Sequence, residues 1–335
     1  MARRAALVAA LLAIVALPAK RYFSGGVNPH APDLTGRTFL ITGANTGLGF
    51  EQARELLALN ATVILTGRDA GRVAGAAARL RAAVPAAAAR LDAAALVDLA
   101  SLASVRAFAA NVTARYARLD VLVLNAGVMK VPRALTADGL ETTLVTNHLG
   151  HHLLTALLLP ALRAAAAATG DARVIAVSSA GHLWGELDAA AIADLSFERR
   201  ADAQAGFAPY TQSKLCNVLF SAELARREEA VGSRVRAFSL HPGAVRTEIF
   251  RNLGKTALVA AETVFAPALW FFFKSPLEGA QTQLFVSTAP IGALTNGAYY
   301  ADCAVSARVN PIARDAALAR ALWLKSDELV GLREV

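Results

Sequence analysis

The stretch from Thr38 to Gly49 joins a short apolar run to a glycine-rich turn in which a helical pattern begins. It reads TFLITGANTGLG. Glycines at such a junction let the chain turn sharply and bring backbone N–H groups and a helix N-terminus against a pyrophosphate. Such a turn can be a plain connection, but directly after the first strand of a strand–helix–strand unit it is a strong sign of dinucleotide binding. The residues expected to hold the dinucleotide are Gly43, Asn45, Thr46, Gly47, Leu48 and Gly49.

Short apolar runs alternate with helical segments along the rest of the chain. Strands are expected at residues 38–42, 61–66, 94–97, 119–124, 173–178, 235–240 and 297–301, and helices at 47–59, 70–83, 101–117, 140–166 and 210–229. Continuous apolar strands that alternate with helices are typical of parallel sheets covered on both faces. The pattern predicts an α/β protein with a Rossmann-type, doubly wound, mostly parallel seven-stranded sheet and helices on both faces.

The chain has 335 residues, of which 55% are hydrophobic, enough to bury one large core. No internal repeat or Ser/Pro-rich linker divides it. We therefore expect one α/β domain over residues 35–305, a separate hydrophobic segment at 1–22 and a helical tail at 306–335.

Composition argues against several other functions. The net charge is +8, but the basic residues are scattered and mostly Arg, whereas a nucleic-acid partner needs them clustered on one face. Cys216 and Cys303 lie far apart, which argues against a disulfide framework or a thiolate zinc site. His148 and His152 have the spacing of helical metal ligands, but no acidic or thiol partner lies nearby in the sequence, so no metal site is expected.

The N-terminal segment has two arginines at positions 3 and 4, an uncharged run from Ala5 to Ala19, and then Lys20-Arg21. The run is shorter than the roughly 20 residues that span a bilayer comfortably, and it matches a signal-peptide core in length. Pro18 and the following basic pair spoil the small-residue cleavage pattern. A membrane anchor or membrane-associated helix is therefore favoured over a cleaved signal or targeting segment. Basic residues flank both sides, so the orientation is not predicted.

The end of the second predicted strand distinguishes NAD from NADP. A carboxylate there binds the ribose hydroxyls of NAD, whereas an arginine accommodates the extra phosphate of NADP. The sequence reads Leu65-Thr66-Gly67-Arg68-Asp69. Arg68 at this place favours NADP(H), while Asp69, one residue further on, leaves NAD(H) open.

Taken together, the motifs resemble those of one family. The turn Thr42-Gly43-x-x-x-Gly47-x-Gly49 is followed in order by Asp98, Asn125-Ala126-Gly127, Asn147, Ser179, Tyr210-x-x-x-Lys214 and Pro242-Gly243. Over about residues 36–305 this set is similar to the classical short-chain dehydrogenase/reductases. The stretches ITGANTGLGFEQARELL and SKLCNVLFSAELARR resemble, more narrowly, retinol dehydrogenases and the oxidoreductase domain of the WW-domain oxidoreductase.

This resemblance implies catalytic roles for Asn147, Ser179, Tyr210 and Lys214. Tyr210 would act as general acid/base, and Lys214, one helical turn away, would lower its pKa by favouring the phenolate. Ser179 would bind and polarise the substrate oxygen; Ser178 has the same hydroxyl, and the family pattern favours Ser179. Asn147 would hold a water that connects Lys214 to solvent.

The resemblance also implies further contacts with the cofactor, for which turn and capping roles are the alternative. Asp98 and Leu99 would lie near the adenine, and Asn125, Ala126 and Gly127 beside the adenine ribose. Tyr210 and Lys214 would lie at the nicotinamide end, where Lys214 would bind the ribose. Pro242, Gly243, Val245 and Thr247 would contact the nicotinamide carboxamide.

Substrate specificity is expected in a lid at about 248–276 and in the insert from Gly181 to Pro209. The lid contains the apolar run from Thr263 to Phe273, which either packs on the core or lines a lipophilic pocket and touches a membrane. With the N-terminal segment, it favours a lipophilic alcohol and its aldehyde or ketone, such as a retinoid, steroid or lipid-derived carbonyl. The expected location is an endoplasmic reticulum or organelle membrane. The resemblance also allows a homo-oligomer formed through the helices that follow the fourth and fifth strands.

Two other functions are kept open. Light-dependent protochlorophyllide reductases share similar stretches, but they carry a cysteine where this chain has Ala244. A non-catalytic dinucleotide-binding scaffold would have no need of all four catalytic residues named above.

Overall fold

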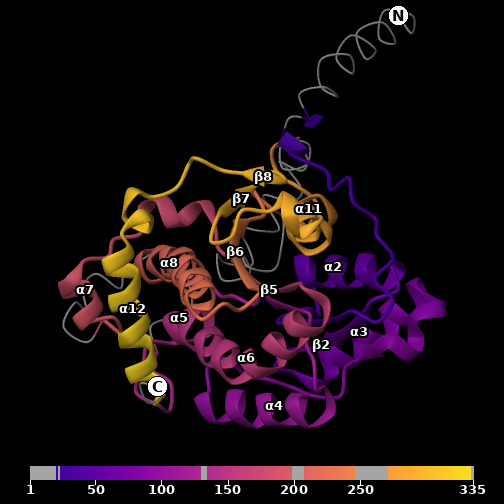
Figure 1. Cartoon of the computed structure of the whole chain (residues 1–335), viewed down its shortest axis with the longest axis horizontal. Coiled ribbons are helices and arrows are strands. Elements are labelled where there is room, and N and C mark those ends of the chain that lie inside the picture. Colours follow the sequence, from indigo (N-terminus) through magenta and orange to yellow (C-terminus); the bar gives the residue numbers. More distant parts are fainter. Residues whose placement is uncertain (1–19, 22, 130–133, 198–206, 246–270, 333–335) are drawn as a thin grey trace, which may run out of the picture.

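The computed structural model describes residues 20–21, 23–129, 134–197, 207–245 and 271–332 (Figure 1). The predicted anchor up to residue 19, the predicted cofactor residue Thr247 and most of the predicted lid lie outside these ranges.

A single sheet forms the centre of the described part. Its strands are β1 (Thr38–Ile41), β2 (Thr62–Leu65), β3 (Leu91–Asp92), β4 (Val121–Leu124), β5 (Ala172–Val177), β6 (Val235–His241), β7 (Tyr299–Ala301) and β8 (Ala304–Val305). Their order is β3-β2-β1-β4-β5-β6-β7-β8, and every neighbouring pair is parallel except β7 and β8. The predicted doubly wound α/β fold is confirmed. Its strand order reverses between β1 and β4, which is where such sheets bind ligands.

The sheet has eight strands rather than the predicted seven. The additional strand, β8, is two residues long and antiparallel, and it follows a tight turn in which Asp302 and Cys303 both have positive φ. A strand this short has no periodicity that a sequence could display.

The third strand begins and ends earlier than predicted, because Leu91 and Asp92, not residues 94–97, pair with β2. The carboxylate of Asp92 accepts the Ala94 N–H at 3.0 Å, and such a local bond competes with the sheet ladder. The predicted run continues beside the end of β2, where Val97 N–H donates to Gly67 O at 3.0 Å.

Helices cover both faces of the sheet (Figure 1). The longer ones are α2 (Gly47–Ala58), α3 (Ala70–Ala83), α4 (Leu102–Arg115), α6 (Gly150–Thr169), α8 (Ala208–Ala230), α11 (Pro276–Thr288) and α12 (Ala316–Leu329). The shorter ones are η1 (Pro85–Arg90), α5 (Thr142–Leu144), η2 (Val145–Leu149), η3 (Ala180–Trp184), α7 (Ala189–Ala193), η6 (Ile291–Ala293) and η7 (Pro311–Arg314).

The hydrophobic core has two halves, one on each side of the sheet. Successive strand residues point to opposite faces, so Leu40 packs with α4, α6 and α8, whereas Phe39 and Ile41 pack with α2, α3 and α11. Helix α12 lies against α8, α7 and α6 and places Leu322 in the first half of the core.

The described residues contain one helix long and apolar enough to cross a membrane, Thr142–Thr169, which joins α5, η2 and α6. This helix packs against α4, α8 and β5, and half of its most apolar stretch is buried inside the protein. The same composition is typical of a core helix, which this one is.

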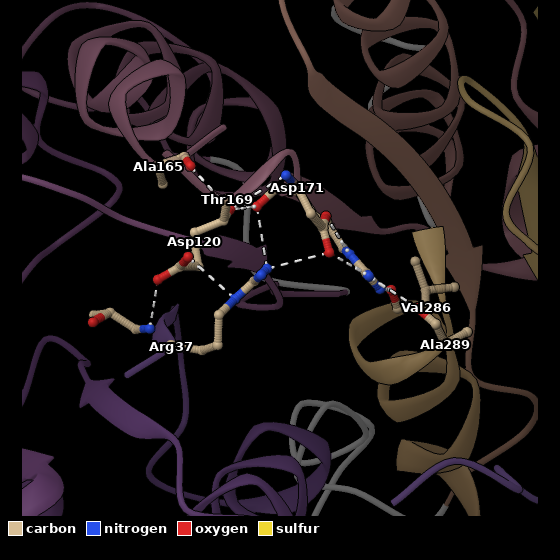
Figure 2. A network of polar contacts seen from close by, with 9 residues as sticks. Arg37, Asp120, Ala165, Thr169, Asp171, Val286 and Ala289 are labelled. Atoms are coloured by element: carbon tan, nitrogen blue, oxygen red, sulfur yellow. Dashed lines mark hydrogen bonds and ion pairs between the residues drawn. The ribbon is translucent and has the colours of Figure 1, made fainter. Parts of the chain in front are cut away.

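The amino ends of β1, β4 and β5 carry a network of charged residues (Figure 2). Arg37 Nε lies 3.1 Å from Asp120 Oδ1, and Arg37 Nη2 lies 3.3 Å from Asp171 Oδ2. Asp120 also accepts the Thr38 N–H at 2.8 Å. Each of these residues stands at or just before a strand, so the network ties three strand starts together.

Arg173 connects the same network to α11. Its guanidinium binds the Asp171 carboxylate at 2.6 and 2.9 Å and donates to the carbonyls of Val286 and Ala289 at 2.7 and 2.9 Å. These carbonyls lie at the C-terminal end of α11, where a cation is favourable. Burial would raise the pKa of Asp171, but the bonds and charge of Arg173 and Arg37 hold that pKa below its usual value.

Candidate active site

A cleft of about 1130 Å³ opens at the carboxyl ends of the parallel strands. It brings together most of the residues predicted to bind a cofactor or do chemistry. They are Gly43, Asn45, Thr46, Gly47, Leu48, Arg68, Asp98, Leu99, Asn125, Ala126, Gly127, Ser179, Tyr210, Lys214, Pro242, Gly243 and Val245. Gly49 and Asn147 do not line the cleft, but they lie against two residues that do, Asn125 and Val128.

The glycine-rich turn has the shape that close approach to a phosphate requires. Gly43 and Gly47 have φ of +64° and +59°, a region that favours glycine. A Cβ on Gly43 would lie 2.9 Å from Ala126 Cα, and a Cβ on Gly49 would lie 2.6 Å from Asn125 Nδ2. The turn therefore excludes side chains both toward the neighbouring loop and behind the helix.

The N-terminus of α2 has no side-chain cap and no acidic residue in its first turn. By contrast, Asp69 caps α3 and Ser101 caps α4. The first N–H groups of a helix need partners from outside the helix. At α2 these groups face the cleft, where the helix dipole favours an anion, so the turn fits a dinucleotide pyrophosphate.

Asn125 holds the turn in place from the neighbouring strand. Its side-chain amide donates to Thr42 O at 2.8 Å, and its own N–H donates to Thr42 Oγ1 at 3.0 Å. Gln283 of α11 donates to Asn125 Oδ1 at 3.1 Å, and His151 of α6 contacts Thr42 Oγ1 at 2.9 Å. Sequence reasoning missed Gln283 and His151, because they come from distant helices and belong to no motif.

The end of the cleft beside the tip of β2 carries two arginines. Arg68 is exposed just beyond the tip of β2 and lines the cleft. Asp69 accepts the Arg72 N–H at 2.8 Å as the N-cap of α3, so its carboxylate has a local structural role. Arg72 also lines the cleft; sequence reasoning missed it, although its spacing of four residues from Arg68 could have suggested it.

Asp98, which the resemblance predicts near the adenine, makes two hydrogen bonds within the protein. Its carboxylate accepts the Ala100 N–H at 3.0 Å, and its N–H donates to Ser104 Oγ at 3.0 Å. These bonds fix the loop between β3 and α4 at the cleft wall.

Tyr210, Ser179 and Lys214 meet at the opposite end of the cleft. A Cβ on Gly181 would lie 3.2 Å from Tyr210 Cε1 and 3.4 Å from Ser179 Oγ, so these two side chains are neighbours. Lys214 Nζ lies 5.7 Å from the centre of the Tyr210 ring. Lys214 Nζ also donates to Val177 O, at the end of β5, at 2.8 Å. Of the two adjacent serines, Ser178 points away, because its hydroxyl donates to Lys214 O at 2.6 Å.

Asn147 lies behind this cluster in the π-helical segment η2, where it is fully buried. Its side chain binds Val128 N and O at 2.8 and 3.0 Å and donates to Ser213 Oγ at 2.9 Å. Such π-helical insertions are frequent at functional sites. The side chain thus fixes the cleft wall through Val128 and the start of α8 through Ser213.

Burial dominates the electrostatics of the cluster. It raises the pKa of the Tyr210 phenol above its usual value, while the hydrogen bond with Ser179 opposes the rise. It also lowers the pKa of Lys214 to about 8. The sequence led us to expect Lys214 to lower the pKa of Tyr210. In the protein without a bound cofactor that pKa is raised instead, because desolvation of the phenolate dominates.

The three histidines of the long helix contact other parts of the protein. His148 Nε2 lies 3.0 Å from Ser326 Oγ, and His152 Nε2 lies 2.6 Å from Asp327 Oδ1, both on α12. Within the described ranges, no group of three or more His, Cys, Asp or Glu residues is arranged to hold a metal ion.

Comparison with known proteins places this geometry in a family. Residues 37–191 match the family model described as short chain dehydrogenase. The chain is 42% identical to retinol dehydrogenase 14 of Mus musculus, covering 98% of this chain and 97% of that protein. It is 40% identical to polyprenol dehydrogenase of Mus musculus, covering 90% and 86%.

Solved structures show the same fold. A crystal structure of an uncharacterized protein from Mycobacterium paratuberculosis has a TM-score of 0.70 and 34% identity, covering 92% of this chain and 98% of that one. The RhlG/NADP active-site complex of Pseudomonas aeruginosa has a TM-score of 0.61 and 27% identity, covering 81% and 96%. The chain therefore belongs to the short-chain dehydrogenase/reductases, an oxidoreductase family, and to its retinol dehydrogenase-like members.

Proposed function

We propose that this protein is an NADP(H)-dependent oxidoreductase that interconverts a lipophilic alcohol and its aldehyde or ketone, with Tyr210 as general acid/base. One cleft that holds Tyr210, Ser179 and Lys214 side by side together with a basic, uncapped nucleotide turn is the observation that carries the proposal. Family membership alone would leave the reaction unassigned, because function depends on the site and not on the fold.

The described residues fit a nicotinamide dinucleotide, which supplies hydride when bound. The N-terminus of α2 would hold its phosphates, and Arg68 with Arg72 would face the additional phosphate of NADP. Asp69, which sequence reasoning kept as an argument for NAD, is bound to the backbone at the start of α3. The related structure described as an NADP complex supports the same preference.

Proton transfer would follow from the cluster at the other end. In the reducing direction the carbonyl carbon receives hydride, and the carbonyl oxygen receives a proton from the Tyr210 hydroxyl. Because burial raises the pKa of Tyr210, the hydroxyl is protonated at neutral pH and can serve as the acid. Ser179 would donate a hydrogen bond to the same oxygen and stabilise its developing charge.

A lipophilic substrate is supported by the walls of the cleft near Tyr210. Trp184 and Phe207 line this region although 69% and 46% of their surfaces are exposed, and Met129 lines it as well. Large exposed apolar side chains at a cleft often mark a binding surface. The names of the relatives, retinol and polyprenol dehydrogenases, point to the same chemical class.

The N-terminal segment would anchor the enzyme to an endoplasmic reticulum or organelle membrane. Just beyond it, Phe23 packs against Phe271 and Phe272 with ring centres 5.5 and 5.1 Å apart, and Phe272 is 53% exposed. An exposed aromatic group beside an anchor is suited to the membrane interface. Deleting residues 1–19 should then move the protein from the membrane pellet to the supernatant in cell fractionation.

We also propose an oligomeric state for the protein. Helix α12 packs against α8 and α6, the helices that follow β5 and β4 and through which the family resemblance allowed association. A monomer is therefore favoured over an oligomer built on that surface.

The decisive test measures oxidation of NADPH or NADH by the purified full chain with a panel of carbonyl compounds. Retinoid, steroid and long-chain aldehydes or ketones should be reduced faster than short polar ones of the same carbonyl type, and NADPH should serve better than NADH. Tight NADPH binding without turnover of any carbonyl or of the corresponding alcohols would instead indicate a dinucleotide-binding scaffold.

A further inference from the structure

A buried lysine lies behind the turn that forms the last wall of the cleft. Lys274 is 5% exposed, and its side chain runs along Gly243, which has φ of +92°. A Cβ on Gly243 would lie 2.7 Å from Lys274 Cε and 2.9 Å from its Nζ. The lysine stem therefore supports the Pro242-Gly243 turn from the side away from the cleft.

Two further contacts fix the same turn. Lys274 N–H donates to Ala244 O at 2.8 Å, and Lys274 pairs with Val245 in an isolated parallel bridge. On the other side, Gly243 N–H donates to His241 Nδ1 at 3.0 Å. Burial lowers the pKa of His241 to about 4, so its imidazole is neutral and can accept this bond. The turn is held between a histidine and a lysine.

The ammonium group of Lys274 is neutralised by Asp302, in the turn between β7 and β8. Nζ lies 2.6 Å from Asp302 Oδ1. A buried cation needs such a partner, because an unpaired one would be very costly. Burial would raise the pKa of Asp302, but the bond and charge of Lys274 outweigh it and hold that pKa low.

The chain from residue 24 to residue 28, which follows the predicted anchor, completes this arrangement. A Cβ on Gly26 would overlap Asp302 O, and the Gly26 N–H helps to hold the pKa of the Asp302 carboxylate low. A Cβ on Gly25 would overlap both Asp302 Oδ1 and Lys274 Nζ. Only two adjacent glycines let the chain that leaves the predicted anchor pass this closely over the ion pair.

The same segment is fastened to α11 on both sides of the glycines. Ser24 Oγ donates to Glu278 Oε1 at 2.6 Å, and Asn28 N–H donates to Gln281 Oε1 at 3.0 Å. The path from Ser24 to Asn28 is thus fixed, and with it the position of Asp302 against Lys274.

We propose that Lys274 is a positioning residue for the nicotinamide side of the cleft, and that Gly25 and Gly26 hold it there through Asp302. This inference rests on the proposed function, because it assumes that the Pro242-Gly243 turn faces the nicotinamide. It gives the chain from residue 24 to residue 28, just after the predicted anchor, a role in cofactor binding. Lys274 does not line the cleft and acts through the turn.

The test compares two ligands by calorimetry or fluorescence: NADPH, and the adenosine bisphosphate half of NADPH, which lacks the nicotinamide. Lys274→Met should weaken NADPH about tenfold, the scale of losing one charge-assisted bond, and leave affinity for the half-ligand unchanged. Gly26→Ala should shift the same ratio in the same direction, because its methyl displaces Asp302. Lys325→Met removes a lysine that is also ion-paired, at 2.6 Å from Glu328, and should change neither affinity.

The outcomes separate the two proposals. If the unaltered protein binds neither ligand, the proposed function fails. If it binds both and Lys274→Met changes neither affinity, or lowers both equally, the positioning role is overturned. Affinity for the half-ligand also reports whether each variant is folded, so a misfolded variant cannot imitate the expected result.

Discussion

The two ends of the parallel strands use their polar groups in opposite ways. At the amino ends, Arg37, Asp120, Asp171 and Arg173 bind one another and nearby backbone atoms (Figure 2). At the carboxyl ends, α2 begins without a cap and Lys214 is buried without a carboxylate partner among its described bonds. The polar groups at the amino ends hold the strands to one another. Those at the carboxyl ends remain available for a ligand, which lowers the stability of the folded protein.

This comparison predicts that substitutions at the carboxyl ends change activity first and substitutions at the amino ends change stability first. The division is expected on physical grounds, because catalytic groups must be desolvated and pre-positioned before a ligand arrives.

The largest effect is expected for Tyr210→Phe. Removing the transferable proton should lower kcat by about 10³-fold, within the range of general acid catalysis, while NADPH affinity stays within about twofold because the ring remains. Steady-state kinetics and NADPH titration measure the two. The matched control is Tyr116→Phe, whose hydroxyl binds Asp92 away from the cleft. A Tyr210→Phe variant that keeps a tenth or more of the original turnover would rule out the acid/base role.

Arg173→Met should have the largest effect on stability. It removes a buried cation together with its four hydrogen bonds to Asp171, Val286 and Ala289, and breaking a buried pair costs about 3 kcal/mol. Urea unfolding should show this loss with kcat unchanged below the transition. Arg236→Met is the control, because Arg236 is the exposed neighbour of Arg173 on β6. Equal losses for the two variants would contradict the importance of the network.

Lys214→Met should stabilise the cofactor-free protein at pH 7 while lowering turnover. Burial lowers the pKa of Lys214 from 10.5 to about 8, so the unfolded chain binds more protons between these values. The stability of the unaltered protein therefore rises as pH increases from about 8 to 10.5, and below pH 8 the full penalty is present.

Removing the charge should gain about 1 to 2 kcal/mol at pH 7, after allowing for the lost bond to Val177. Urea unfolding at pH 7 and at pH 10 measures the difference between the two proteins, which should shrink at the higher pH. A variant that is less stable than the original at pH 7 would show that the buried charge of Lys214 does not destabilise the folded protein.

Arg68→Ala should give the smallest effect and sharpen the choice of cofactor. Loss of one charge-assisted contact with phosphate should weaken NADPH about tenfold and NADH less than twofold. Arg81→Ala, an exposed arginine in the last turn of α3, should leave both affinities unchanged. Equal weakening of NADPH and NADH by Arg68→Ala would reject a phosphate-binding role.

The sequence predicted the fold well where elements are long or strongly patterned. The strand from Val121 to Leu124 and the helix that contains Tyr210 and Lys214 formed as expected, because each carries its apolar pattern within one segment. Ser179 and Tyr210 also lie together in the cleft, although they are distant in sequence. Both could be predicted because the family resemblance named them.

The misses have a common physical origin. The π-helical segment around Asn147, the two-residue strand β8 and the shift of β3 to Leu91–Asp92 depend on local competition among a few hydrogen bonds. Short elements of this kind gain too little from their own residues to show in a pattern. Lys274 and Gln283 were missed because their partners come from remote parts of the chain.

The sequence by itself determined the alternation of strands and helices, the glycine turn and the identities of the chemical groups. These follow from periodicity and from the few residue types that a backbone conformation or a proton transfer permits. Only the tertiary structure decided that the Ser178 hydroxyl is bound to Lys214 O while Ser179 lies beside Tyr210, that burial raises the pKa of Tyr210, and that two N-terminal glycines pass over the Lys274–Asp302 ion pair. Desolvation and long-range pairing depend on which segments surround a residue, and that is known only once the chain is folded.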